Sequence, residues 1–206
     1  MMKIWGRANS ANVKKVLWIA GELELDYERI DVGGPFGGLS DPAYLAKNPN
    51  GLIPLLEDDG ALLWESNTIV RYLAARHSGK GLWIEDPLKR AEGEKWMDWA
   101  STTFARDFSA VMMNLIRLPE EKRNPALVEQ GWAALTRAVR IPEEALGRQN
   151  WLSGESFGIG DIPLGSFIHG WFQLPLERPA VPNIENWYKR LKERPAYLKT
   201  VATPLT

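Results

Sequence analysis

Cysteine is absent from this chain of 206 residues, and histidine occurs only twice, at His77 and His169. The lack of cysteine excludes disulfide bonds, thiolate metal sites and a cysteine nucleophile. Two histidines are too few for a multi-histidine metal site, and they make a histidine-based catalytic triad hard to assemble. We therefore expect no metal, and any thiol chemistry must use a thiol that another molecule brings.

The sequence also lacks a surplus of charge of one sign and a long apolar run. It has 25 Lys and Arg residues against 26 Asp and Glu residues, which gives a formal net charge of −1. Near-neutrality argues against a general nucleic-acid binder, which usually carries a basic surplus. No apolar run approaches the roughly 18 residues of a membrane span, and the first residues lack the apolar stretch of a signal peptide. We expect a cytoplasmic protein that binds neither nucleic acid nor membranes.

The first 76 residues alternate short apolar runs with helical periodicity. The expected order is strand, helix, strand, hairpin and helix, over residues 4–5, 13–20, 27–32, 53–64 and 66–76. A strand, a helix and a strand this close together imply a parallel pair with a right-handed crossover. Glu57 to Gly60 separates two apolar runs, which is a hairpin signal with Gly60 supplying a positive φ. We expect a four-stranded mixed sheet covered by helices, the plan of a thioredoxin-like domain.

The second half of the sequence has helical periodicity throughout. Asp86-Pro87 places a capping residue before a proline at the first helical position. Further helices are expected to start near residues 125, 158 and 182, and Pro142 should kink or end the helix before it. The chain is therefore divided into an α/β thioredoxin-like domain over 1–76, a linker over 77–86 and an all-helical domain over 87–206.

Two junctions between strands and helices carry candidate binding residues. Ser10 stands at the start of the first helix, where its hydroxyl either caps the helix or faces a bound anion beside the positive helix end. Asn12, in the first turn, has the same two interpretations. Ser66, as the N-cap of a later helix, either caps it or offers its hydroxyl to a carboxylate while Glu65 pairs with an ammonium group.

A third candidate is the segment before the hairpin, where Ile53-Pro54 invites a cis peptide bond. Such a bond would leave the backbone of Ile53 available to an extended peptide, although a mere loop entering an edge strand is equally plausible. In a thioredoxin-like fold, these three features converge along one edge, where they can grip a short acidic peptide.

The motifs Asn-Pro-Asn-Gly-Leu-Ile-Pro-Leu-Leu at 48–56 and Trp-Glu-Ser-Asn-Thr-Ile at 64–69 resemble the glutathione-site motifs of cytosolic glutathione transferases. Gly-Ile-Gly-Asp-Ile at 158–162 and the segment 182–197 are similar to signatures of the family's helical domain. The resemblance spans nearly the whole chain. One departure is Gly158, since the family usually has Ser or Thr as the helix cap there.

The resemblance implies a role for each matching residue of the first domain. Ile53 would pair its backbone with the cysteinyl unit of glutathione, and Pro54 would be the cis proline. Glu65 and Ser66 would hold the γ-glutamyl end. Ser10 would stabilise the thiolate. The weaker candidates are Asn12 for the thiol side and Phe36 and Gly37 for the glycine end.

In the helical half, the segment 99–106 resembles the long helix of theta-like members of the family. The resemblance implies that this segment lines a second-substrate site or reaches across a dimer through Trp99, Thr103, Phe104 and Arg106. The absence of cysteine excludes the branches of the family that reduce mixed disulfides through an enzyme thiol.

The resemblance thus implies a Ser-type glutathione transferase that conjugates glutathione, its co-substrate, to a small hydrophobic electrophile, and it implies a homodimer. Two alternatives stay open. One is a glutathione-dependent peroxidase or isomerase that uses the same thiolate, and the other is a non-catalytic ligand-binding protein on the same fold.

Overall fold

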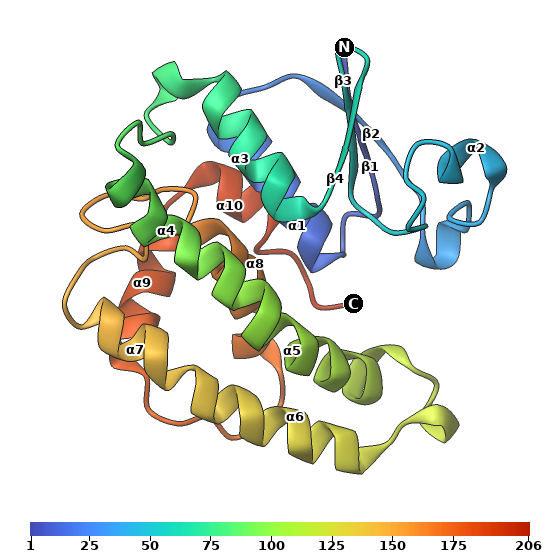
Figure 1. The fold of residues 1–206 in the computed structure, drawn as a ribbon. Helices are drawn as coiled ribbons and strands as arrows, with labels where there is room; N and C mark the ends of the chain where they lie inside the picture. The colour runs from blue at the N-terminus through green and yellow to red at the C-terminus, as the bar shows by residue number, and fades with distance from the viewer. The chain divides into compact units, whose positions relative to one another are not determined.

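The computed structural model describes all 206 residues, which divide into two compact units (Figure 1). The first unit comprises Met1–Glu85 and Arg194–Thr203, and the second comprises Asp86–Glu193 and Pro204–Thr206. The first unit therefore includes a segment near the C-terminus that helical periodicity alone assigns to the helical domain.

The first unit is built on a four-stranded sheet in the order β2-β1-β3-β4. Its strands are β1 (Met2–Trp5), β2 (Tyr27–Ile30), β3 (Leu55–Asp58) and β4 (Ala61–Trp64). Strand β1 is parallel to β2 and antiparallel to β3, which is antiparallel to β4. This is the thioredoxin-like arrangement that the sequence predicts.

The hairpin between β3 and β4 turns through Asp59 and Gly60, whose φ angles are 47° and 82°. Positive φ at both central residues matches the right-handed twist of the strands, so the short turn fixes the register of the pair. Strand β3 begins at Leu55, two residues later than predicted. Pro54 cannot donate to a sheet ladder, because it has no backbone N–H.

Four helices accompany the sheet: α1 (Ala11–Glu22), α2 (Pro42–Leu45), α3 (Ser66–Arg76) and α10 (Pro195–Thr200). Helix α1 packs against both α3 and α10. Gly21 permits the second contact, because a Cβ there would lie 3.0 Å from the Cβ of Ala196. The glycine-rich loop after β2 holds a short 3-10 turn over Gly34–Phe36.

The second unit is helical. Helices α4 (Pro87–Trp99) and α5 (Ala105–Met112) form one continuous run with π-helical segments over Ala100–Phe104 and Met113–Arg117. The remaining helices are α6 (Pro125–Ala138), α7 (Arg140–Leu146), α8 (Asp161–Gln173) and α9 (Pro182–Lys192). Every residue of α8 from Asp161 to Trp171 is buried, so α8 is the central helix of this unit.

The predicted helix boundaries in the second unit have local causes. The Asp86 side chain accepts a hydrogen bond of 2.9 Å from the Lys89 amide, so it caps α4 as expected. Helix α6 ends at Ala138, the residue whose carbonyl the ring of Pro142 would meet in a continuous helix.

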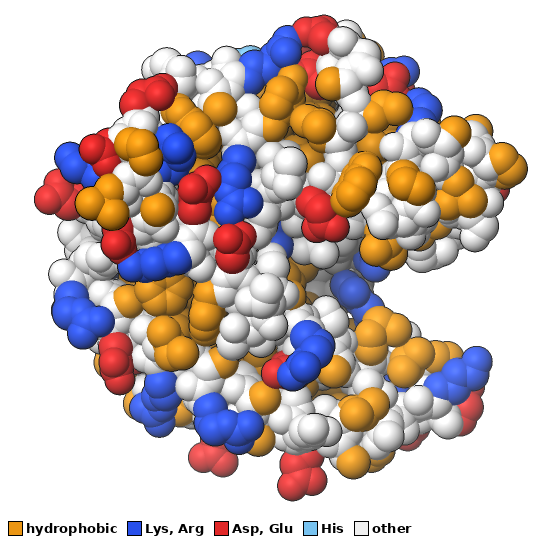
Figure 2. Space-filling view, in the orientation of Figure 1, with side chains coloured by type: hydrophobic (Ala, Val, Ile, Leu, Met, Phe, Trp, Pro, Cys, Tyr) orange, Lys and Arg blue, Asp and Glu red, His pale blue; other side chains and the backbone are white.

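No helix in the structure is both long and apolar enough to cross a membrane. Acidic and basic side chains are interspersed over the visible side of the helical unit (Figure 2). This mixture agrees with the near-zero net charge of the sequence.

Candidate functional site

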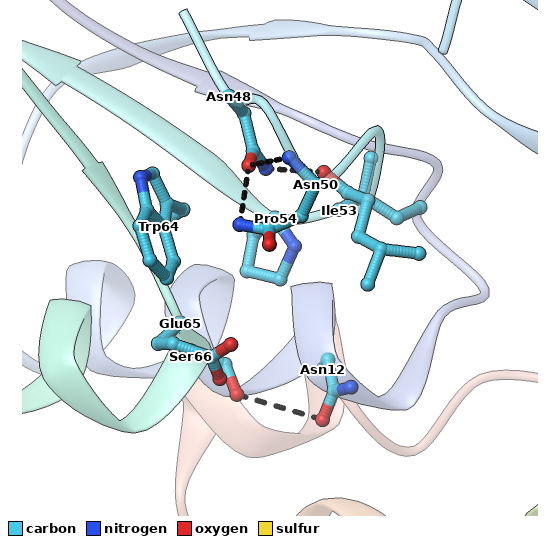
Figure 3. Close-up of a pocket in the computed structure, with 9 residues that line it drawn as sticks. Asn12, Asn48, Asn50, Ile53, Pro54, Trp64, Glu65 and Ser66 are labelled. Carbon is cyan, nitrogen blue, oxygen red and sulfur yellow. Dashed lines mark hydrogen bonds between the residues drawn. The ribbon is translucent and has the colours of Figure 1, made fainter. Parts of the chain in front are cut away.

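A pocket of about 70 Å³ lies in the first unit, where the predicted binding segments come together (Figure 3). It is lined by Asn12, Asn48, Asn50, Leu52, Ile53, Pro54, Trp64, Glu65 and Ser66. The lining therefore combines the start of α1, the loop before β3 and the junction of β4 with α3. Five of the residues predicted for glutathione are among them: Asn12, Ile53, Pro54, Glu65 and Ser66.

The junction of β4 with α3 has an unusual backbone. The sequence predicts Ser66 as the N-cap of α3, whereas the structure has Glu65 at the cap position and Ser66 as the first helical residue. Glu65 has φ 71° and ψ 110°, and such a conformation of a non-glycine residue costs on the order of 1–3 kcal/mol. Its exposed carboxylate takes no part in capping, so it is available to a cation. Strain retained at one residue of a pocket points to a functional role.

Ser66 connects α3 with α1 through its hydroxyl, which is largely buried. Its Oγ donates to Oδ1 of Asn12 over 3.5 Å (Figure 3) and accepts from Nζ of Lys15 over 3.4 Å. Burial lowers the pKa of the Lys15 ammonium to about 7, and the negative charge of Glu65 opposes part of that shift. Both predicted ligand-binding residues at the N-terminus of α3, the cap residue Glu65 and the first helical residue Ser66, therefore interact with one buried lysine.

Lys15 is a residue that the sequence reasoning missed. The periodicity marks Val13, Val16, Leu17 and Ala20 as the buried face, but the structure buries every residue of α1 from Val13 to Ala20. The available signal was spacing, because Lys15 stands three residues after Asn12 and so shares its face of the helix.

The opposite side of the pocket is formed by the loop before β3 (Figure 3). The Ile53–Pro54 peptide bond is cis, as the resemblance implies. The paired residues of the sheet start at Leu55, and Ile53 takes part in no backbone hydrogen bond of a turn. The backbone of Ile53 is therefore available to an extended ligand.

Two asparagines fix this loop, and neither is among the predicted site residues although both lie in the motif at 48–56. Asn48 is 1% exposed, and its Nδ2 donates to the Leu52 carbonyl over 2.7 Å. Its Oδ1 accepts from the backbone N–H and from Nδ2 of Asn50 over 3.1 and 3.0 Å. The motif at 48–56 therefore contains residues that hold the loop in place as well as the residues predicted to contact a ligand.

Ser10 is the N-cap residue of α1, but its side chain makes no capping hydrogen bond. The residue is 9% exposed, and it stands two positions before Asn12, which lines the pocket. Simple capping, the plainer of the two interpretations of Ser10, therefore does not describe the structure. The Ser10 hydroxyl can therefore donate a hydrogen bond to another group beside the N-terminus of α1.

Phe36 and Gly37 lie outside this pocket. Phe36 is exposed and lines a separate cavity of about 310 Å³ whose wall also includes Trp5, Tyr44 and Lys47. Gly37 follows the 3-10 turn and has no neighbour within 4 Å of a Cβ built on it.

The four predicted residues of the helical unit fall into two groups. Trp99 is half-buried, while Thr103 and Arg106 are exposed. Phe104 is fully buried, with ring centroids 5.9 Å from Phe108 and 6.0 Å from Phe167. We therefore correct the expectation for Phe104 and assign its side chain to the aromatic core of this unit.

The pocket can recognise an amino-acid moiety at the end of a peptide. The Glu65 carboxylate suits an ammonium group, while Ser66 and the N-terminal amides of α3 suit a carboxylate. The backbone of Ile53 suits the peptide that follows. No cluster of three or more His, Asp or Glu side chains that could hold a metal ion occurs in the structure.

Comparison with known proteins agrees with this chemistry. The sequence matches the family models for the glutathione S-transferase N-terminal domain over residues 6–81 and C-terminal domain over residues 96–195. It is 46% identical to glutathione S-transferase GstB of Escherichia coli (strain K12), with 100% of both chains covered. It is 30% identical to glutathione S-transferase 3 of Zea mays, over 98% of this chain and 93% of the maize protein.

A solved structure is also similar over the whole chain. It is that of the theta class glutathione S-transferase from the citrus canker pathogen Xanthomonas axonopodis pv. citri with glutathione bound. The TM-score is 0.96 at 47% identity, and the match covers 100% of this chain and 99% of that one.

Proposed function

Because the chain belongs to the glutathione S-transferase family, we propose that it binds glutathione in this pocket, activates the thiol as a thiolate and conjugates it to a hydrophobic electrophile. The observation that carries the proposal is the Ser10 hydroxyl, which makes no capping bond at the N-terminus of α1.

We assign the γ-glutamyl end of glutathione to the pocket. Its ammonium group pairs with Glu65, and its carboxylate receives hydrogen bonds from Ser66 and the first amides of α3. A pocket of about 70 Å³ is too small for the whole tripeptide, and we place the cysteinyl unit extended along the backbone of Ile53, beside cis Pro54. The glycine end then extends towards the Phe36-Gly37 loop.

The thiol is activated without a general base. A free thiol has a pKa near 8.5, and lowering it by two units requires about 2.7 kcal/mol of preferential stabilisation of the thiolate. A hydrogen bond from Ser10 to a charged acceptor contributes roughly 1.5–3 kcal/mol, and the N-terminus of α1 contributes about 0.3–1 kcal/mol more. Asn12, which is exposed beside the pocket, assists on the thiol side.

We place the electrophile against Trp99, Thr103 and Arg106 of the helical unit. Thr103 belongs to the π-helical segment Ala100–Phe104, and such segments occur frequently at functional sites. Phe104 supports this segment from the core and does not contact the substrate.

We further propose that the protein is a cytoplasmic homodimer that serves detoxification. Its reaction needs reduced glutathione, which the cytosolic redox poise maintains. Size-exclusion chromatography with light scattering tests the dimer directly, because a monomer of 23.2 kDa is easily distinguished from a pair.

The first experiment is the difference absorbance of bound glutathione thiolate as the pH is raised. In the wild type, we expect the thiol to titrate about two units below its free pKa. In Ser10→Ala, we expect the pKa to return towards 8.5, which lowers the thiolate fraction at pH 7 and the conjugation rate roughly 20-fold. Glutathione affinity should change by no more than a few-fold.

The matched control is Ser78→Ala, which removes an exposed serine hydroxyl elsewhere in the same unit. It should titrate like the wild type. Unchanged turnover in Ser10→Ala would remove Ser10 from the mechanism, and bound glutathione with an unshifted thiol pKa in the wild type would instead indicate a carrier.

A further inference from the structure

The buried lysine beside the pocket has no part in the roles assigned so far. Lys15 lies on α1 where this helix packs against α3, and it is only 1% exposed. A lysine is almost never fully buried unless other groups compensate its charge. Its Nζ lies 3.4 Å from Oγ of Ser66, the residue assigned to the ligand carboxylate.

The protonation state of Lys15 decides what the Ser66 hydroxyl can do. An ammonium group has three donors and no acceptor, so Ser66 can only accept from it and keeps its own proton for Asn12 or a ligand. A neutral amine has a lone pair, to which Ser66 can donate instead. The charged form of Lys15 therefore prepares Ser66 to bind a carboxylate, and the neutral form competes for the same proton.

Both forms of Lys15 are accessible near neutral pH, because burial lowers its pKa to about 7. Glu65, the cap residue of the neighbouring helix α3, is the group whose charge raises this pKa. Lys14, the adjacent residue of α1, donates to the Val201 carbonyl over 3.0 Å. The other charged residues on elements packed against α1 or in the sheet are Lys3, Glu28, Arg29, Glu57, Asp58, Arg71, Arg76 and Lys199, together with Arg194 at the N-cap of α10.

We propose that Lys15 is a positioning residue of the γ-glutamyl subsite, which takes up a proton when glutathione binds and thereby orients the Ser66 hydroxyl towards the ligand carboxylate. The inference rests on the proposed function, since it requires the γ-glutamyl end in this pocket. The negative ligand carboxylate stabilises the ammonium form, so the bound complex retains the proton at a pH where the free protein has partly lost it. Affinity therefore falls as the pH rises above 7.

Isothermal titration calorimetry tests this coupling with S-methylglutathione, which has no thiol to titrate. Repeating the titration at pH 7.5 in buffers of different ionisation enthalpy gives the number of protons taken up. We expect roughly half a proton or more per ligand for the wild type. For Lys15→Met, we expect weaker binding and a loss of that proton uptake. Subtracting the uptake of Lys15→Met from that of the wild type cancels any proton taken up by the amino group of the ligand.

Two further variants separate positioning from packing. Lys15→Gln retains an N–H donor for Ser66 but does not titrate, so it should bind more tightly than Lys15→Met and show no proton uptake at Lys15. Lys14→Met removes the neighbouring buried ammonium and should keep the wild-type uptake. Proton uptake in Lys15→Met equal to that of the wild type overturns the proposal, as does wild-type binding without uptake. If the wild type does not bind S-methylglutathione, the proposed function itself fails.

Discussion

At the scale of single residues, the binding role proposed for Lys15 conflicts with the stability of the fold, because burying a charged lysine destabilises the folded state. The folded-state pKa of about 7 is lower than the ordinary lysine value of 10.5, so the unfolded chain binds more protons between these two values. Stability therefore rises with pH across this window, and the penalty of burying the charge is fully present below pH 7. A binding function is a sufficient reason to retain such a residue.

We predict that Lys15→Met increases the free energy of unfolding, because methionine fills a similar volume without a charge to desolvate. The gain should be on the order of 1 kcal/mol or more at pH 6.5 and should shrink as the pH rises towards 10. Urea denaturation at both pH values measures it, with Lys14→Met as the comparison. A gain that grows with pH would contradict the assigned pKa.

Glu65 shows a limit of prediction at the residue scale. The motif at 64–69 predicts Glu65 and Ser66 as ligand-binding residues, but no local pattern predicts a positive φ at a glutamate. That conformation is imposed by the way β4 enters α3 within the folded unit. The one-residue shift of the cap, from Ser66 to Glu65, has the same origin.

At the scale of elements, the N-terminus of α8 explains how the chain tolerates Gly158 where the family usually has Ser or Thr. The Oγ of Ser153 accepts a hydrogen bond of 3.0 Å from the Gly160 amide. A Cβ added at Gly158 would lie 2.9 Å from both Cβ and Oγ of Ser153. The serine thus occupies the space of the missing side chain and satisfies an amide at the start of the helix.

A double-mutant cycle tests this replacement. Gly158→Ser should destabilise the protein because it clashes with Ser153, and Ser153→Gly should destabilise it by about 1 kcal/mol because it removes the acceptor. The double variant restores a serine in the same space. Its loss of unfolding free energy should therefore be smaller, by about 1 kcal/mol, than the sum of the losses of the two single variants. Thermal and urea unfolding provide the values, and additive losses would show that the two positions are independent.

The elements themselves were largely predictable because local chemistry determines them. The Asp59-Gly60 turn and the Asp86-Pro87 cap lie where the sequence places them. The π-helical segments were not predictable, since they depend on packing between helices. In the site, the motifs predict Ile53, Pro54, Glu65 and Ser66, which line the pocket. Lys15, in contrast, becomes evident only when α1 and α3 are packed together.

At the scale of the whole molecule, the division of the chain is nonlocal. Periodicity assigns everything after residue 86 to the helical domain, but Arg194–Thr203 belongs to the first unit. Arg194 forms an ion pair of 2.7 Å with Glu22 at the end of α1. Tyr197 is fully buried, with its ring centroid 4.7 Å from that of Trp18. These contacts join residues about 180 positions apart, which a local pattern cannot show.

We therefore predict that Tyr197→Ala weakens α1 rather than α9, which immediately precedes it in the sequence. Loss of the buried ring should destabilise the first unit by roughly 3–5 kcal/mol. Hydrogen exchange should accelerate at the amides of Ala11–Glu22 and remain near wild-type rates in Pro182–Lys192. Leu198→Ala, at the next and exposed position of α10, should change neither. Faster exchange in α9 with unchanged exchange in α1 would instead assign α10 to the helical unit. It would also show that α10 does not stabilise α1, the helix that carries Lys15 and is capped by Ser10.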